Sequence, residues 1–440
     1  MQAITNASVR IVSRWLPDAF VLAVILTLVV FALGMGVTQQ TPLAMANYWG
    51  EGFSALFKFG MQMTLVLLTG YVLALTPALQ AALNGLTRLP STPRQALVLT
   101  VIVSFACYYI NWGFGMVVGA ILAREMGRRV TGLHFPLLVA AAYGGELVRG
   151  PSSSIPLVVA TPDNFLSDLI GVVPVSDTLY SWWNIVLTLA LVALLALLYL
   201  GMRPPSREIV EFRPDGNDAN IQAEGKDKAS TPAEWLERSR WPTLLLGLIA
   251  LAYLLGSIAS QGFNINLNTV ILIFLTAGLL LHSSPAAYLS ATEQAVGAAR
   301  GIIVQFPLYA GIAGMMTHSG LVDAFSAAFV SIATPHTFPL LTFLSAGFVN
   351  FFIPSGGGQW AIQGPIMVKA AHAIGADPAQ TIMAFAWGDG WTNQIQPFWA
   401  LPLLGVAGLS ARDIMGYCLI WLGVSGTAIA GTFIALSIFA

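Results

Sequence analysis

The sequence predicts an all-α polytopic membrane protein with two inverted-topology repeats, about nine full spans and two re-entrant helical hairpins. The first observation is composition: of 440 residues, 56% are hydrophobic and only 9% are charged, whereas a soluble domain carries roughly a quarter charged residues. The second is length, because several apolar runs reach the ~20 residues that cross a bilayer. The third is the stretch "NFFIPSGGGQW" (350–360), which interrupts an apolar run with glycines and amides.

This composition also argues against several classes of protein. The formal net charge is −1, so no nucleic-acid partner is expected. Cys107 and Cys418 lie far apart without metal-ligand spacing, and no GxxxxGK[ST] loop is present to hold ATP. No His/Asp constellation at membrane depth supports an enzyme. We expect no cofactor and no metal, apart from Na⁺ or H⁺ as a coupling ion.

The distribution of basic residues predicts the orientation in the membrane. The polar stretch 203–240 holds 15 charged residues and reads as a linker between two apolar halves. The other short joints that carry arginine contain Arg88, Arg94, Arg124, Arg128, Arg129, Arg300 and Arg412. Because positive joints stay in the cytoplasm, the N-terminus and the linker are expected there. The C-terminus is then expected on the opposite side of the membrane.

The elements follow from this orientation, taken in chain order. The first repeat, 1–202, has spans near 17–38, 52–76 and 182–201, a re-entrant hairpin near 95–123 and a broken helix near 135–161. A linking span near 241–260 follows the linker. The second repeat, 261–440, has spans near 269–282, 301–320 and 412–438, a re-entrant hairpin near 338–371 and a broken helix near 380–405.

Each repeat carries two interruptions in the same order. They are "CYYINWGFGMVVGA" (107–120) with "YGGELVRGPSSSIP" (143–156), and "NFFIPSGGGQWAIQG" (350–364) with "WGDGWTNQIQP" (387–397). Non-helical backbone in a membrane must be buried in protein or line water. Paired breaks in oppositely oriented halves indicate the binding site of a transporter.

The residue types at these breaks suit a carboxylate and a cation. A half-helix N-terminus carries partial positive charge, and glycine lets a ligand approach the backbone. The substrate-binding candidates are Asn111, Gly113, Ser152, Ser153, Arg149, Asn350, Ser355, Gly356, Gly357, Gln359, Thr392 and Asn393. Asn and Ser oxygens suit Na⁺, and ionisable groups at membrane depth are functional candidates. The cation-binding or proton-coupling candidates are Asn111, Ser154, Asn350, Asp389, Asn393 and Glu146.

We expect these candidates to form two half-sites. Asn111, Gly113 and Gly115 would face the Ser152–Ser154 region, and Asn350 with 355–359 would face 389–394. The alternatives are structural. Small residues in membrane helices allow close packing, and Glu146 could simply pair with Arg149 to organise its loop, rather than leave that arginine to a substrate carboxylate. Lys58 is expected to snorkel from the outer end of its span.

Long stretches resemble the bacterial short-chain fatty acid transporter family, part of the ion transporter superfamily. They include "RWLPD" (14–18), "GFSALFKFGMQM" (52–63), "INWGFGMVVGA" (110–120), "NFFIPSGGGQWAIQGPI" (350–366) and "QPFWALPLLG" (396–405). The resemblance implies uptake of monocarboxylates such as acetoacetate and butyrate, coupled to a cation. It also implies the bacterial inner membrane as the compartment, which makes the side of the C-terminus periplasmic. It further implies re-entrant hairpins with site residues at their tips, a homodimer and an elevator-like movement.

The expected function is secondary active import of short-chain monocarboxylates. One alternative is a cation-coupled transporter of another carboxylate, a dicarboxylate or an acyl-amino acid, for which Arg149 is the one candidate second cation. Another is a gated anion channel, which would not accumulate its substrate. Chain length, the coupling ion and its stoichiometry are left open by the sequence.

Overall fold

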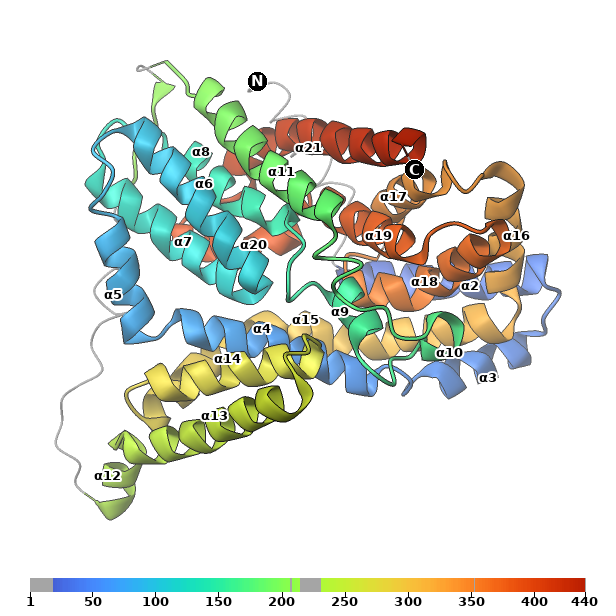
Figure 1. Ribbon diagram of the computed structural model, residues 1–440, viewed down its shortest axis with the longest axis horizontal. Helices are drawn as coiled ribbons and strands as arrows, with labels where there is room; N and C mark the ends of the chain where they lie inside the picture. The colour runs from blue at the N-terminus through green and yellow to red at the C-terminus, as the bar shows by residue number, and fades with distance from the viewer. Residues whose placement is uncertain (1–18, 206–207, 214–230, 352, 440) are drawn as a thin grey trace.

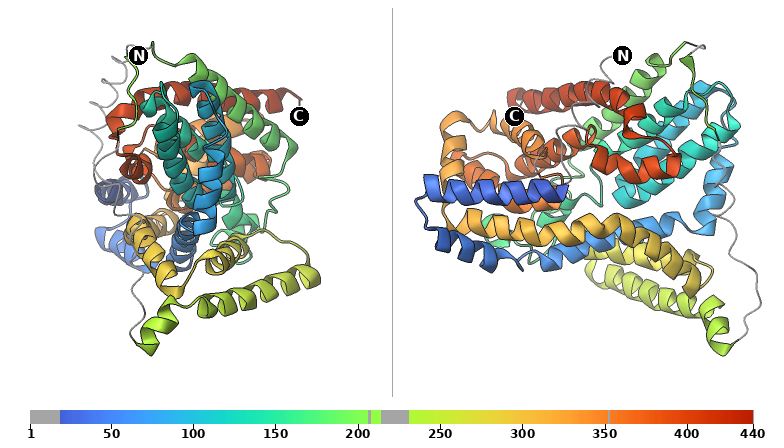
Figure 2. Two further views of the ribbon diagram at one scale, coloured as in Figure 1. Left: turned by 90° about the vertical axis from the view of Figure 1, so that its left-hand side faces the viewer. Right: turned by 180° about the vertical axis from the view of Figure 1, so that it is seen from behind.

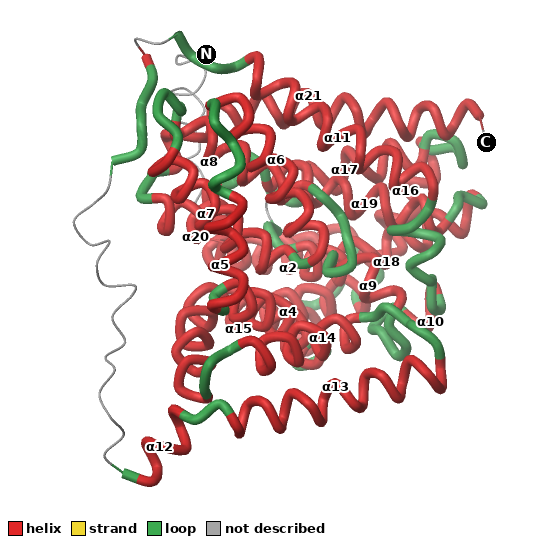
Figure 3. Tube along the Cα trace, turned by 60° about the vertical axis from the view of Figure 1, so that its left-hand side comes forward, coloured by secondary structure: helices red, strands yellow, loops and turns green. Residues whose placement is uncertain are grey.

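The computed structural model describes residues 19–205, 208–213, 231–351 and 353–439. Every regular element in these ranges is helical, and no strand occurs among them (Figure 3). The all-α class predicted from composition is therefore confirmed. The "RWLPD" motif and half of the linker 203–240, residues 206–207 and 214–230, lie outside the described residues.

The helices are numbered in chain order. Up to the linker they are α2 (Ala19–Val37), α3 (Pro42–Gly52), α4 (Phe57–Ala74), α5 (Pro77–Leu86), α6 (Pro93–Ile110), α7 (Trp112–Arg129), α8 (Phe135–Tyr143), the 3₁₀ helix η1 (Gly144–Leu147), α9 (Ser154–Ala160), α10 (Ser167–Ile170) and α11 (Trp182–Gly201). After it they are α12 (Pro232–Arg238), α13 (Trp241–Gln261), α14 (Leu267–Leu281), α15 (Pro285–His318), α16 (Leu321–Ile332), α17 (Phe338–Val349), α18 (Gly356–Ile374), α19 (Pro378–Asn393), α20 (Pro397–Ala407) and α21 (Ala411–Phe439).

Seven of the described helices are long and apolar enough to cross a membrane: α2, α4, α6, α11, α13, α15 and α21. Shorter apolar helices occur at α8, α14, α16 and α17. A multi-pass membrane protein follows from these helices. The count of nine full spans stays a prediction, because length and composition alone do not say which short helices complete a crossing.

Many helices begin with a capping side chain followed by a proline in the first turn. Thr92 accepts a hydrogen bond from the Gln95 N–H at 3.3 Å in front of α6, Ser284 accepts from Ala287 at 3.2 Å in front of α15, and each helix has proline in its first turn. Proline is favourable there because its missing N–H would have no helical partner. The cap explains why α15 begins at Pro285 rather than near 301, as expected from the apolar pattern alone.

The helices form two layers, which Figures 1 and 2 show from three directions. In the lower layer of Figure 1, the long helix α15 packs against α2, α3 and α4, and α14 packs between α4 and α13. In the upper layer, α6 packs against α7 and α11, α17 packs against α19, and α21 packs against α8 and α11. The layers meet where α7 contacts α4 and where α18 contacts α15.

The two predicted hairpins correspond to α6–α7 and α17–α18. Asn111 alone separates α6 from α7, in extended backbone with φ −157° and ψ 126°. The second break is longer, from Asn350 to Ser355. The hairpins lie at opposite ends of the molecule in Figure 1, as re-entrant segments of two oppositely oriented repeats would. The inverted repeat itself stays a prediction.

Candidate functional site

The first hairpin tip is anchored to α4. The Asn111 Oδ1 caps α7 by accepting from the Phe114 N–H at 2.9 Å, and its Nδ2 donates to the Val66 carbonyl of α4 at 3.1 Å. A Cβ on Gly113 would come within 2.8 Å of the Leu67 carbonyl. Asparagine is suited to this break because one amide supplies both a helix cap and a bond to the neighbouring helix. The side chain of Asn111 thus faces α4 rather than the serines of the first break.

The loop between η1 and α9 lies between the two hairpin tips. Ser152 Oγ accepts from the Trp112 N–H of the first tip at 3.0 Å. Ser154 Oγ lies 2.8 Å from the position that a Cβ on Gly356 of the second tip would take. Ser153 Oγ accepts from the Gly150 N–H at 2.9 Å and so closes the turn of the loop itself. Ser152 therefore bonds to the first tip, Ser153 bonds within the loop, and Ser154 lies against the second tip.

The second hairpin tip is glycine-rich because its neighbours leave no room for side chains. A Cβ on Gly356 would lie 2.7 Å from Asp389 Oδ2, and one on Gly357 would collide with the ring of Phe59. Ser355 caps α18 weakly, accepting from the Gly358 N–H at 3.4 Å. The N-terminus of α18, with its partial positive charge, is thus placed beside a carboxylate and the α9 serine.

Asn350 joins the second hairpin to the second broken helix. Its Nδ2 lies 2.7 Å from the Asp389 carbonyl, 2.9 Å from Thr392 Oγ1 and 2.7 Å from Asn393 Oδ1. Gln396 Nε2 donates back to the Asn350 carbonyl at 2.9 Å. Asn350 is fully buried, so these bonds replace the water that its amide would otherwise bind.

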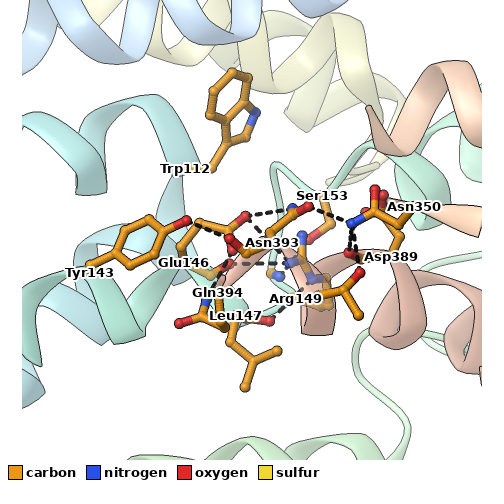
Figure 4. Close-up of polar contacts among 12 residues, drawn as sticks. Trp112, Tyr143, Glu146, Leu147, Arg149, Ser153, Asn350, Asp389, Asn393 and Gln394 are labelled. Atoms are coloured by element: carbon orange, nitrogen blue, oxygen red, sulfur yellow. Dashed lines mark hydrogen bonds and ion pairs between the residues drawn. The ribbon is translucent and has the colours of Figure 1, made fainter. Parts of the chain in front are cut away.

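Glu146 joins the two broken helices. Its Oε1 accepts from Asn393 Nδ2 at 3.0 Å, and its Oε2 accepts from Gln394 Nε2 at 3.0 Å. The Tyr143 hydroxyl donates to the Asn393 carbonyl at 2.6 Å. Figure 4 shows these groups in one connected network, with Glu146 and Asn393 between Tyr143 and Asn350. Residues about 250 positions apart along the chain are thus held together.

Arg149 lies beside this network, and its guanidinium bonds to main-chain carbonyls and forms only a long ion pair. Its Nε donates to the Leu147 carbonyl at 3.1 Å and its Nη2 to the Glu146 carbonyl at 3.1 Å, while the ion pair to Glu146 Oε1 is long, at 3.7 Å. A Cβ on Gly390 would collide with the guanidinium, so α19 passes directly against it. The side chains of Arg149 and Glu146 are 12% and 11% exposed.

Four buried oxygens of the network have no hydrogen-bond partner among the described residues. They are Asn350 Oδ1, Asp389 Oδ1, Gln394 Oε1 and Gln396 Oε1. A buried acceptor without a donor is costly unless a cation or a proton binds it. With Asp389 Oδ2 and Ser154 Oγ both next to Gly356, the donor set is all oxygen, which suits Na⁺ or a proton.

Asn111, Ser152 and Ser153 bond at the first tip and within its neighbouring loop, and the structure separates the other candidates into two groups. Ser154, Asn350, Thr392, Asn393, Asp389, Glu146 and Arg149 lie around one buried polar region with Ser355 and Gly356 at its edge. Gly113 packs on α4, Gly357 packs on Phe59, and Gln359 bonds the Ala346 carbonyl at 2.8 Å inside its own hairpin. For these three the contacts are those of packing.

Sequence reasoning did not single out Tyr143 or Gln396, and it included Gln394 only as the end of the range 389–394. All three are buried and bonded into the network. The two glutamines could have been identified from the sequence, because glutamine is rare in an apolar segment and both precede Pro397. Tyr143 had none, because a tyrosine in an apolar helix is as often an interfacial residue.

Comparison with known proteins identifies the family. The family model of the short chain fatty acid transporter matches residues 1–436. A protein of Escherichia coli K12 named "Putative short-chain fatty acid transporter" is 45% identical over 427 residues, covering 96% of this chain and 97% of its own. A Haemophilus influenzae protein of the same name is 43% identical over 418 residues, covering 93% and 94%.

A solved structure shares the fold. The crystal structure of the Alcanivorax borkumensis YdaH transporter, described as having an unusual topology, aligns with a TM-score of 0.56 over 96% of this chain and 98% of its own, at 18% identity. That identity supports the fold alone. The family match and the two relatives describe a transporter and not an enzyme. The chain belongs to the short-chain fatty acid transporter family.

Proposed function

We propose that the protein is a secondary active transporter that imports short-chain monocarboxylates of the acetoacetate and butyrate type, driven by a cation gradient. The observation that carries this proposal is the buried polar region at the junction of both broken helices and the second hairpin tip. A polar site held by irregular backbone inside an apolar helical protein is the arrangement expected of a transporter.

The carboxylate would bind near Arg149 and the N-terminus of α18. The Nη1 of Arg149 has no partner among the described residues, so two N–H groups remain for an anion. The Gly356 N–H belongs to a residue without a side chain of its own and lies at a positive helix end. One arginine and one helix end suit a monocarboxylate better than a dicarboxylate, which favours a second cationic side chain.

A coupling cation would balance the charge of the site. Glu146 and Asp389 carry two negative charges if both are ionised, and Arg149 carries one positive charge. An uncompensated buried charge costs several kcal/mol, so the net charge of −1 favours uptake of one cation, and a bound carboxylate, which makes the net charge −2, favours it further. The unpartnered oxygens of Asn350 and Asp389 would hold Na⁺, and either carboxylate would hold a proton.

The two layers support an elevator-like movement. The site is built from η1, α17, α18 and α19, whereas α2, α3, α4 and α15 form the opposite layer. We propose that the first group moves against the second, in a homodimer in the bacterial inner membrane with the C-terminus periplasmic.

The test is uptake of labelled butyrate into proteoliposomes. One set receives an inward Na⁺ gradient, a second an inward H⁺ gradient, and a third neither. Accumulation above equilibrium in the first or second set supports coupled import and identifies the ion. Equilibration in all three sets would instead support the anion channel. If no set takes up butyrate, the same assay with a dicarboxylate and an acyl-amino acid tests the other carboxylate transporters.

A further inference from the structure

A cavity of about 180 Å³ lies between the start of α4 and the segment that joins α9 to α10. Its lining includes Lys58 and Gln62 on one side and Thr161, Asp163 and Asn164 on the other. We name this space, bounded by residues 55–62 and 158–165, the vestibule cavity. It is separate from the Glu146–Asn350 network, and none of the substrate or cation candidates lines it.

The vestibule cavity adjoins the second hairpin tip through Phe59. This residue lines the cavity, and its ring is the first atom group that a Cβ on Gly357 would meet. The ring centroid of Phe59 lies 5.3 Å from that of Phe165, also in the lining, and 5.6 Å from that of Phe306. A ligand in this cavity would therefore rest one aromatic ring away from the glycine tip of the proposed transport site.

Most neutral polar groups of the cavity are already bonded to the protein. Gln62 Nε2 donates to Asn268 Oδ1 at 2.8 Å, and Thr161 Oγ1 donates to the Leu157 carbonyl at 2.6 Å. Asn164 Oδ1 accepts from the Leu166 N–H at 3.0 Å. These residues shape the wall and keep little capacity to bind a ligand.

Lys58 is different. It is exposed and forms no ion pair with any residue of the described ranges. Its ammonium group supplies three donors, and the aromatic and aliphatic walls at Phe59, Phe165 and Val158 supply an apolar surface beside it. A cation beside an apolar wall is complementary to an anion that carries a short hydrocarbon chain. The volume is below the ~300 Å³ at which drug-sized ligand pockets begin, so the occupant has only a few carbon atoms.

We propose that the vestibule cavity is a second binding site for short-chain carboxylates, with the Lys58 ammonium paired to the carboxylate and the chain against Phe59 and Phe165. The substrate class rests on the proposed function; the site itself rests on the cavity and its unpaired lysine. The site captures the substrate before it reaches the hairpin tip. Asp163, the other charged residue of the lining, opposes the anion and keeps its binding weak enough for onward transfer.

The competing interpretation is that Lys58 only extends to water from the end of α4, or pairs with Asp163 across the cavity as the two layers close. Neither needs a carboxylate in the vestibule cavity. The two readings differ in whether butyrate protects the cavity wall from a chemical probe, and in whether that protection needs the lysine.

The experiment uses the full-length protein with Cys107 and Cys418 replaced by alanine and with Ala55→Cys placed in the cavity wall. The rate at which a maleimide labels this cysteine is measured against butyrate concentration. Butyrate should slow the labelling. Lys58→Gln should raise the butyrate concentration for half-protection about fivefold, as expected for loss of an exposed ion pair, and Asp163→Asn should lower it.

Two further variants separate this site from the transport site. Lys369→Gln is the matched control, because 38% of the Lys369 side chain is accessible but it pairs with Asp323 at 2.6 Å outside the cavity; it should leave protection unchanged. Asn350→Ala should reduce uptake at least tenfold and keep protection. Protection that is absent, or that persists unchanged in Lys58→Gln, overturns the vestibule site while uptake stands. Protection without uptake by the unmodified protein overturns the proposed transport and leaves the binding site in place.

Discussion

Asn350 connects three segments through its side chain and its main-chain carbonyl. Its amide nitrogen reaches α19 at three oxygens, and its carbonyl receives Gln396 from the segment before α20. An amide nitrogen has two hydrogens, so three acceptors must share them. The strength of these hydrogen bonds therefore depends on the position of α17 relative to α19, and a small displacement between the two helices would change it.

We expect Asn350→Ala to reduce uptake at least tenfold. The substitution leaves buried acceptors on α19 without a donor, at a cost of roughly 1–3 kcal/mol. Asn350→Asp keeps the shape but removes the N–H donors and should have the same effect. Asn84→Ala, on the exposed face of α5, is the matched control. Normal uptake by a folded Asn350→Ala protein, checked by size-exclusion chromatography, would remove this region from the site.

Arg149 has two interpretations, a substrate ligand or an organiser of its loop. If it binds the carboxylate, Arg149→Lys should raise KM about tenfold with little change in kcat, since a lysine cannot make the bidentate contact. Arg88→Lys, at an exposed joint, is the control. An unchanged KM, measured in the proteoliposome assay, would assign Arg149 to the carbonyls of Glu146 and Leu147 alone.

Among the elements, the segment Glu208–Arg213 is attached to the joint before α8. The Val210 N–H donates to His134 Nδ1 at 3.0 Å, and the Phe135 N–H donates to the Val210 carbonyl at 2.8 Å. Because Nδ1 accepts, the neutral ring carries its proton on Nε2, which lies 3.0 Å from the Tyr417 hydroxyl. One end of the linker is thus fixed to the layer that contains the site.

This attachment should weaken in acid. Burial lowers the pKa of His134 below its ordinary value of 6.5, so the neutral form is favoured in the folded protein. The stabilisation is then present above about pH 6.5 and is lost as the pH falls through the lower folded pKa. Hydrogen exchange at Val210, corrected for intrinsic rates, should quicken as the pH falls. His134→Phe should exchange quickly at every pH; a pH-independent protection in the unmodified chain would contradict the assignment.

For the whole molecule, the arrangement in two layers accounts for both the membrane location and the enclosed polar site. The lower layer contains the long, uninterrupted helix α15, and the upper layer contains both broken helices. Apolar side chains cover the exposed faces of helices such as α2 and α13, for example Leu28 and Ile249. The polar groups of the site are turned inward, where only protein can satisfy them.

The predicted orientation can be tested by cysteine accessibility in intact cells. In a chain without Cys107 and Cys418, Ala233→Cys in α12 should be shielded from an impermeant thiol reagent, and Val172→Cys in the joint before α11 should react. Both positions are exposed, so burial does not explain a difference. Labelling at residue 233 with shielding at 172 would invert the topology, because the basic joints would then be outside.

Composition and local pattern were enough to predict the membrane class, the helical content and the places where helices break. Those features depend on nearby residues: an apolar run long enough for a bilayer, a glycine or proline that cannot continue a helix, an asparagine that caps one. The partners across the breaks could not be predicted. Ser154 lies at the second hairpin tip, Asn111 is bonded to α4, and Glu146 meets Asn393 and Gln394. These pairings join segments that are distant in sequence, so they depend on how whole helices pack, and no local propensity specifies them.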